Sequence, residues 1–189
     1  MLIIGDVHGM VDQYNRLIKN SDRSIQVGDF GFAKQHEWHM KNCDPAKHQI
    51  VFGNHDDYGY LKSPHSLGNY SLTPEGIFTI RGAESIDKQH RVEGVSWWRE
   101  EELNWSEANQ VVESYMQLRP EIVISHDCPD SVCRSLFGYS GSFTRKLLEN
   151  LFQLYQPSLW IFGHHHKSKN EVILGTRFIC LNELETFKL

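Results

Sequence analysis

One local pattern recurs along this chain: a short apolar run is followed at once by glycine or a cluster of polar side chains. The runs cover residues 1–4, 24–27, 49–52, 121–125 and 159–162. Runs of this length that are rich in Ile, Val and Phe are typical of buried strands. Ligands in open α/β sheets collect beyond the carboxyl ends of the strands. We therefore expect the polar clusters to converge at one edge, although they are far apart in sequence.

Helical patterns lie between some of these predicted strands. Residues 10–19 and 142–155 place apolar side chains at helical spacing. Residues 106–118 predict a third helix that begins at a capping Ser106 and ends before a proline. Alternation of strands and helices favours a layered α/β architecture.

Other segments predict strands that are not separated by helices. Residues 76–81 and 91–97 are strand-like, and residues 172–174 and 177–181 resemble the two arms of a hairpin. The interior is therefore expected to hold one mixed sheet or more than one sheet. With no repeat, low-complexity tract or linker, the pattern predicts a single domain over residues 1–189.

Charge and cysteine content narrow the classes of partner. The 189 residues carry a net charge of −5 and the pI is near 6.1. No basic field is therefore expected to attract long duplex DNA or an anionic membrane. No apolar run approaches a membrane span, and no signal peptide is evident. The four cysteines form no CxxC pair, which favours reduced thiols and a cytoplasmic protein.

The polar clusters contain side chains suited to divalent metals. Asp6 and His8 are two residues apart, so both can reach one ion, and the two oxygens of Asp29 can bridge two ions. Nitrogen and oxygen ligands without thiolate suit Mn, Fe, Ni or Zn better than Ca or Mg. The seven candidate ligands are too many for one tetrahedral site, but they fit two adjoining ions. In enzymes that transfer or hydrolyse phosphoryl groups, two such ions lie about 3.5–4 Å apart. The candidate ligands are Asp6, His8, Asp29, Asn54, His126, His164 and His166.

These motifs together resemble those of the calcineurin-like metallophosphoesterases. They are Asp6-x-His8, Gly28-Asp29, Gly53-Asn54-His55-Asp56, a lone His126 after a strand, and Gly163-His164-x-His166. They occur in the order of the family and span almost the whole chain. Each alone is a weak signal, but five together are specific. The resemblance implies a four-layer αββα fold, a β-sandwich flanked by helices.

The resemblance also implies a role for each residue and for two divalent ions. Asp6, His8, Asp29 and His166 would hold the first ion. Asp29, Asn54, His126 and His164 would hold the second. A bridging hydroxide would attack phosphorus in line, while His55 would stabilise the transition state or protonate the leaving oxygen. Manganese is the expected metal because it serves widely in the family, with Fe, Ni or Zn as alternatives.

Two departures from the protein Ser/Thr phosphatases shape the expected substrate. Residues 30–34 lack the Asp and Arg that extend the second motif there. The third motif of those enzymes continues with a Glu and usually an Arg, whereas here it continues with Asp56-Asp57-Tyr58. The expectation is hydrolysis of phosphodiesters or small phosphate esters, including a nucleotide or RNA. The alternatives are a phosphomonoesterase acting on proteins or small molecules, a nuclease, and an inactive scaffold of the same fold. With the usual orienting Asp absent, Asp57 or Asp127 is expected to orient His55.

Several further residues receive a structural interpretation. The pair Trp97-Trp98 suggests either an aromatic shelf for a nucleobase or packing, and packing is favoured. Arg81 is interpreted as an exposed residue or a structural ion pair, and residues 100–102 as a solvated acidic turn. His165 is expected to point away from the ligands on either side of it. The remaining histidines fit no metal spacing and are interpreted as structural: His36, His39, His48, His65 and His90.

Overall fold

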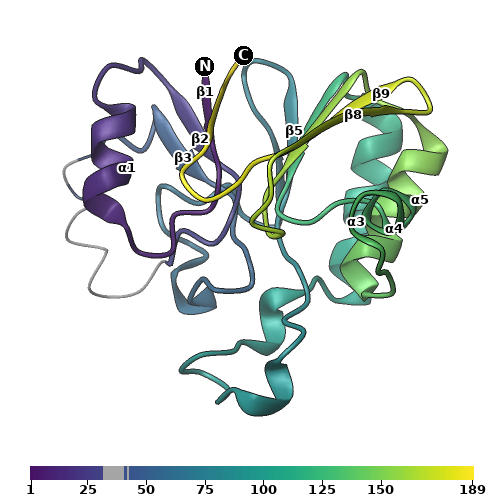
Figure 1. The fold of residues 1–189 in the computed structure, drawn as a ribbon, viewed down its shortest axis with the longest axis horizontal. Helices are drawn as coiled ribbons and strands as arrows, with labels where there is room; N and C mark the ends of the chain where they lie inside the picture. The colour runs from purple at the N-terminus through teal and green to yellow at the C-terminus, as the bar shows by residue number, and fades with distance from the viewer. Residues whose placement is uncertain (32–40, 42) are drawn as a thin grey trace.

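Two β-sheets face each other in the middle of the molecule (Figure 1). The computed structural model describes residues 1–31, 41 and 43–189. His36 and His39, which were interpreted as structural, and residues 32–34 after the second motif lie outside the described residues. The first sheet has the order β10 (Thr186–Lys188), β1 (Leu2–Ile4), β2 (Ser24–Gln26) and β3 (His48–Ile50). Strands β1, β2 and β3 are parallel, and β10 is antiparallel to β1.

The second sheet is mixed. Its order is β4 (Tyr70–Leu72), β5 (Ile77–Ile80), β6 (Ile122–Ser125), β7 (Leu159–Phe162), β9 (Thr176–Cys180) and β8 (Lys169–Ile173). The four inner strands are parallel, and β4 and β8 are antiparallel additions at the edges. The β8–β9 pair is the hairpin expected from the sequence, and β5 confirms the predicted strand over residues 76–81.

Helices cover the outer faces of both sheets. Helix α1 (Val11–Ile18) lies outside the first sheet, and α3 (Trp105–Leu118), α4 (Asp130–Phe137) and α5 (Phe143–Leu154) lie outside the second (Figure 1). This arrangement confirms the predicted αββα sandwich. The described residues also include the short 3-10 helices η1 (Tyr58–Tyr60), η2 (Lys88–His90) and η3 (Arg99–Glu101). None of the helices in the described ranges is long and apolar enough to cross a membrane.

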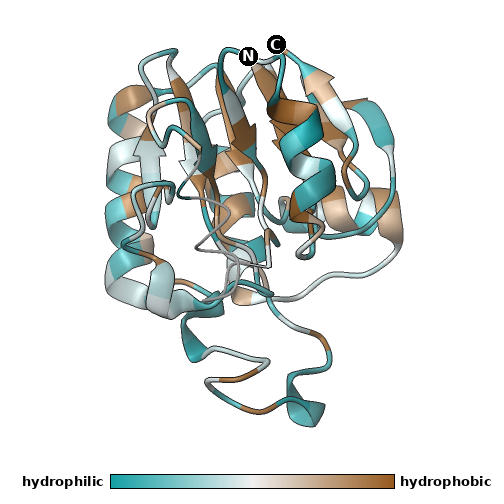
Figure 2. Cartoon of the chain, turned by 90° about the vertical axis from the view of Figure 1, so that its left-hand side faces the viewer, coloured by the Kyte–Doolittle hydropathy of each residue, from teal (hydrophilic) through white to brown (hydrophobic). Residues whose placement is uncertain are grey.

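Aliphatic side chains fill the space between the sheets, where Ile3, Ile124 and Ile161 are completely buried. A larger core packs the second sheet against its helices around Trp160 and Phe152. Figure 2 shows the hydrophobic colouring concentrated on the strands, while the helices carry both colours. Each such buried side chain contributes about 1.5–3 kcal/mol to folding. This packing fixes the strand ends from which the polar clusters extend.

Two predicted elements differ from the structure. Helix α3 begins at Trp105 because Asn104, not Ser106, is its N-cap, in a capping box with Glu107. Residues 91–97 do not form a ladder; within the described chain they contribute only the isolated bridge between Glu93 and Trp97. Their valines face solvent, so no apolar face is available to dock on a sheet. They belong to a segment of turns over residues 82–104, the 82–104 lobe, which projects below the sandwich in Figure 1.

The loops that follow β1, β2, β3, β6 and β7 meet at one edge of the sandwich. The backbone N–H groups of Val7 and His8 donate to the carbonyl of Asp29, and Gly163 N–H donates to the carbonyl of His126. These bonds join the loops of neighbouring strands in both sheets. The convergence expected from the strand pattern is therefore present.

Candidate active site

The first group of candidate ligands consists of Asp6, His8, Asp29 and His166, whose ligand atoms all lie within 4.8 Å of one another. His8 Nε2 and His166 Nε2 are 2.9 Å apart. His166 Nε2 lies 3.3 Å from Asp6 Oδ2, and His8 Nε2 lies 3.8 Å from Asp29 Oδ2. Imidazole nitrogens and carboxylate oxygens therefore point at one common volume.

The second group consists of Asp29, His126 and His164. His126 Nε2 lies 3.3 Å from Asp29 Oδ1 and 3.2 Å from Asn54 Oδ1. Asp29 thus presents Oδ2 to the first group and Oδ1 to the second. The structure brings all seven predicted ligands into two adjoining groups that share this carboxylate.

Glycines make room for these side chains. A Cβ added at Gly53 would lie 2.3 Å from Asp29 Oδ1 and 2.6 Å from His126 Nε2, and one at Gly163 would lie 2.1 Å from Asp6 Oδ1. No larger residue fits without displacing a candidate ligand. Gly53 and Gly163 are therefore explained by the close approach of their backbone to the candidate ligands.

Backbone strain is concentrated at the same place. His8, Asp29, His164 and His166 have φ of 46°, 55°, 65° and 49°, which is the left-handed region. Non-glycine residues rarely adopt this region, and strain of this kind clusters at functional sites. The fold therefore imposes unfavourable backbone angles on four of the candidate ligands, which is consistent with a site held for chemistry.

The chemistry of the donors fits transition-metal ions. Four imidazoles, two carboxylates and one amide oxygen match the nitrogen and oxygen sets preferred by Mn, Fe and Zn. His126 Nδ1 lies 3.1 Å from the carbonyl of Val27, which directs Nε2 towards the ligand groups. The hydrogen bond expected behind a metal-binding histidine is thus present.

Electrostatics favour the ligand forms of two of these side chains, Asp29 and His164. Burial by itself would raise the pKa of Asp29, but the surrounding imidazoles outweigh it and hold that pKa far below its usual range. Burial lowers the pKa of His164 to about 3, so its ring is neutral at pH 7. Ionised carboxylate and neutral imidazole are the forms that bind metal.

A chain of hydrogen bonds orients Asn54. Its Nδ2 donates to Ser85 Oγ at 3.1 Å, and Ser85 Oγ donates to Glu101 Oε2 at 2.6 Å. Ser85 N–H donates to Glu101 Oε1 at 2.9 Å, so both carboxylate oxygens are engaged. Because the single hydroxyl proton points to Glu101, Ser85 must accept from Asn54. The amide oxygen of Asn54 is therefore turned towards His126 and the second ligand group.

This chain corrects the interpretation of residues 100–102 as a solvated acidic turn. Glu101 is only 2% exposed, and burial raises its pKa. Glu102 accepts from the N–H and hydroxyl of Thr144 in the first turn of α5. Helix η3 directs Glu101 inward, a long-range contact that local composition does not reveal.

Arg81 and Trp98 have structural roles. Arg81 is 2% exposed, donates from Nε to Asn69 Oδ1 and lies 3.6 Å from Glu107 Oε2. Its interpretation as a structural ion pair is confirmed, whereas the expected exposure is wrong. Trp98 packs, partly buried, against the core around α1, which confirms packing for that ring.

Arg91 is the neighbour of the His55 ring. Its Nη1 and Nη2 lie 3.1 and 3.2 Å from Nδ1 and Nε2 of the imidazole, and Asp87 Oδ1 lies 2.7 Å from its Nε. Burial lowers the pKa of His55, Asp29 opposes that shift and Arg91 adds to it. The imidazole beside this guanidinium is therefore favoured in its neutral form.

The carboxylates expected to orient His55 are engaged elsewhere. Asp57 accepts from Gly59 N–H at the start of η1, and Asp127 pairs with Arg145. The sequence prediction for these two residues is therefore wrong. Arg91 was missed because it belongs to the 82–104 lobe, whose turns carry no periodic signal that would locate it.

A second arginine reaches the site from α5. Arg145 Nε lies 2.8 Å from Asp127 Oδ2, both side chains are buried, and Nη2 lies 3.5 Å from His164 Nε2. Arg145 lies on the buried face of an amphipathic helix, where the sequence pattern led us to expect apolar residues. It was therefore missed as well.

A cleft of about 670 Å³ opens over both ligand groups. Arg91 and the 82–104 lobe contribute one wall, and Tyr139 and Arg145 contribute another. Ile86, which is 82% exposed, also lines it. The cleft therefore combines candidate metal ligands, two guanidinium groups and apolar surface.

Comparison with known proteins identifies relatives of this fold. The profile of the calcineurin-like phosphoesterase family matches residues 1–168. No curated protein matches the chain. A dimetal phosphatase from Danio rerio is 11% identical with a TM-score of 0.57, over 98% of this chain and 88% of that chain. A protein of Thermus thermophilus is 12% identical with a TM-score of 0.55, over 97% of this chain and 90% of that chain. At such identities the two structures indicate a shared fold.

Proposed function

Because this chain belongs to the calcineurin-like phosphoesterases and is a metal-dependent phosphoesterase, we propose that it hydrolyses phosphodiesters or small phosphate esters in the cleft described above. The observation that carries the proposal is the carboxylate of Asp29, shared by two sets of ligands at the base of the cleft. Such an arrangement suits two adjoining ions that act on one phosphate.

We assign the ligands as the motif resemblance implies. Asp6, His8, Asp29 and His166 hold one ion, and Asp29, Asn54, His126 and His164 hold the other. Two bound divalent ions, for which manganese is our first candidate, supply an acidified water and neutralise charge on the phosphate. The protein contributes the fixed positions of these ligands.

Arg91 and Arg145 bind the non-bridging oxygens of the phosphate. Both guanidinium groups line the cleft, and Arg145 is held in place by Asp127. Guanidinium groups form strong, directional hydrogen bonds to phosphate. These two residues take the part of the arginines that the motifs of protein phosphatases supply and this chain lacks.

His55 acts on the leaving oxygen. The neutral ring, partly exposed at the cleft, has an N–H to donate as negative charge develops on that oxygen. Its backbone N–H donates to Asp29 Oδ1 at 2.7 Å, which fixes the residue beside the shared ligand. His55 thus contacts substrate and remains off the metals.

The size of the cleft and the net charge favour a small ester. A volume of about 670 Å³ suits a ligand of nucleotide size. Exposed Ile86 and Tyr139 offer apolar contact to the organic part of an ester. A net charge of −5 disfavours long duplex nucleic acid. A diester or small ester therefore fits better than a phosphoprotein or DNA duplex.

Hydrolysis of bis-p-nitrophenyl phosphate and p-nitrophenyl phosphate tests this proposal. Metal-stripped protein is assayed after addition of Mn, Ni, Zn or Mg, with the His55→Gln variant as the control for background hydrolysis. We expect metal-restored turnover that favours the diester. Preference for the monoester would support a phosphatase instead. Two bound ions without turnover of either compound would contradict the proposal and favour the inactive scaffold.

A further inference from the structure

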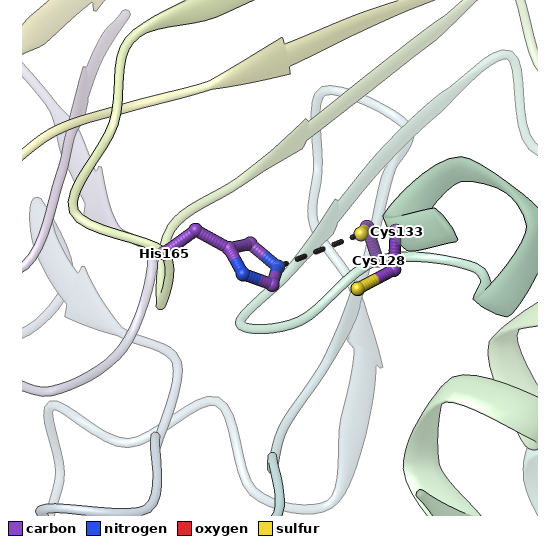
Figure 3. A group of neighbouring side chains, drawn as sticks. All are labelled: Cys128, Cys133 and His165. Atoms are coloured by element: carbon purple, nitrogen blue, oxygen red, sulfur yellow. Dashed lines mark hydrogen bonds between the residues drawn. The ribbon is translucent and has the colours of Figure 1, made fainter. Parts of the chain in front are cut away.

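A compact cluster of cysteine and histidine side chains lies behind the loop that carries His164 and His166. It consists of Cys128, Cys133 and His165, shown in Figure 3. Both cysteines are 0% exposed, and so is the His165 side chain. The two sulfur atoms and a ring nitrogen all lie within 4.8 Å of one another. None of these three residues belongs to the ligand groups of the active site.

The distance between Cys128 Sγ and His165 Nε2 matches that of two ligands on one tetrahedral ion. Bonds of about 2.3 Å to sulfur and 2.0–2.1 Å to nitrogen place these ligand atoms about 3.6 Å apart in a tetrahedral zinc site. Cys128 Sγ lies 3.6 Å from His165 Nε2. These two atoms are therefore at the spacing that zinc requires.

Asp127 lies beside the same ring nitrogen but outside the group of three. Its Oδ1 is 3.1 Å from His165 Nε2 and also accepts from Cys128 N–H. Arg145 binds the other oxygen of Asp127, so this carboxylate is held in position.

Contacts behind His165 resemble the outer shell of a metal-bound histidine. Its Nδ1 lies 2.5 Å from the hydroxyl of Tyr139, and its ring stacks on Phe137 with centroids 3.9 Å apart. Hydrogen bonding at one ring nitrogen fixes the orientation of the other. Nε2 is therefore directed towards Cys128 Sγ and Asp127 Oδ1.

We propose that Cys128, Cys133 and His165 bind a Zn²⁺ ion separate from the dinuclear site. Thiolate ligands select zinc over the harder ions suited to the nitrogen and oxygen groups of the cleft. Binding displaces the thiol protons, and the three ligands are buried.

The ion would join two active-site loops. Cys128 follows His126 after β6, and His165 lies between His164 and His166 after β7. Both neighbours of His165 have left-handed backbone angles. A zinc ion on His165 would hold this strained loop against the turn that begins α4.

Cobalt substitution distinguishes this site from the dinuclear one. The full chain is stripped of metal and titrated with Co²⁺ alone, and the near-ultraviolet spectrum is recorded. Thiolate bound to Co²⁺ gives an intense charge-transfer band, which nitrogen and oxygen ligands do not give. We expect one equivalent of Co²⁺ per chain to produce the band, and Zn²⁺ to abolish it.

Variants locate the ion. Cys128→Ser and Cys133→Ser should each lose the band, whereas Cys43→Ser, which changes a half-buried thiol elsewhere, should retain it. A wild-type chain without the band, or a band that survives in both cluster variants, overturns the proposal. The wild-type spectrum decides the matter even if a variant fails to fold. The readout does not depend on phosphoesterase turnover, so the two proposals can fail separately.

Discussion

The two ligand groups share Asp29 but differ in their surroundings. In the first group, the side chains of His8 and His166 are 22% and 44% exposed. In the second, those of His126 and His164 are 0% and 12% exposed. One half of the candidate site thus faces the cleft, and the other half is built into the sandwich core.

This difference in exposure should affect how readily each group exchanges its metal ion. Solvent and substrate reach the first group directly, so an ion there should exchange readily. The second group is held by the core and by the hydrogen bonds from Asn54 through Ser85 to Glu101. Ligands fixed by packing and outer-shell bonds retain metal more tightly. We therefore expect a dilute chelator to remove one ion per chain well before the other.

Asp29→Asn should weaken metal binding in both ligand groups, which would abolish the difference between them. This is the largest effect that we expect. The variant loses the charged bridge between the groups, so the affinity for both ions should fall. Substitution of a residue that hydrogen-bonds to a metal ligand typically lowers activity ~10–100-fold. Because Asp29 is itself a proposed ligand of both ions, the loss of activity should be larger. Metal content and turnover measure the effect, with far-ultraviolet circular dichroism to confirm folding. Two ions bound at wild-type affinity would show that Asp29 is not the shared ligand.

His55→Gln should leave both groups intact while turnover falls. Loss of a group that donates to the leaving oxygen costs roughly 10²–10⁴-fold in rate. Metal content should remain at the wild-type value because His55 is off the metals. His90→Gln, an exposed histidine of the 82–104 lobe, serves as the control and should be unchanged. Wild-type turnover in His55→Gln would exclude the proposed role.

Glu101→Gln should lower the metal affinity of the buried second ligand group only. The glutamine oxygen accepts from Ser85 N–H, which leaves its NH₂ group facing Ser85 Oγ, so the hydroxyl proton of Ser85 loses its acceptor. The Asn54 amide should then turn and lose its oxygen ligand. Affinity for the second ion should fall roughly 10–100-fold.

Calorimetric metal titration measures this effect beside Glu100→Gln, the exposed neighbour of Glu101. Equal loss of both ions in Glu101→Gln would contradict the link between Glu101 and the second group. Rescue of the second affinity by a carboxylate at the same position, in Glu101→Asp, would support it.

Arg91→Met should give the smallest effect. The remaining guanidinium of Arg145 still reaches the cleft, so we expect kcat/KM to fall about tenfold, near the lower end for a hydrogen bond to a charged group. Metal content should not change. Arg99→Met, whose side chain is 77% exposed beside Glu93, should behave as wild type. An unchanged kcat/KM in Arg91→Met would show that Arg91 does not bind the phosphate.

Local patterns predicted much of the fold. Apolar runs followed by glycine or a polar cluster located five strand ends, and helical spacing located α1 and α5 to within one residue at each end. The family resemblance and the αββα sandwich are confirmed. Helix α3 began at a different cap because Asn104 and Ser106 are both good capping residues. Only the capping box with Glu107 decides between them.

The sequence by itself determined which residues carry the candidate chemistry, because each ligand closely follows a strand and the carboxyl ends of strands meet at one edge. Tertiary structure alone decided their environment. It buried one ligand group and exposed the other, brought Arg91 and Arg145 to the cleft, and placed Glu101 behind Asn54. It also gathered two cysteines and His165 into one cluster. These contacts join segments far apart in the chain, and packing between layers, rather than any periodic pattern, determines them.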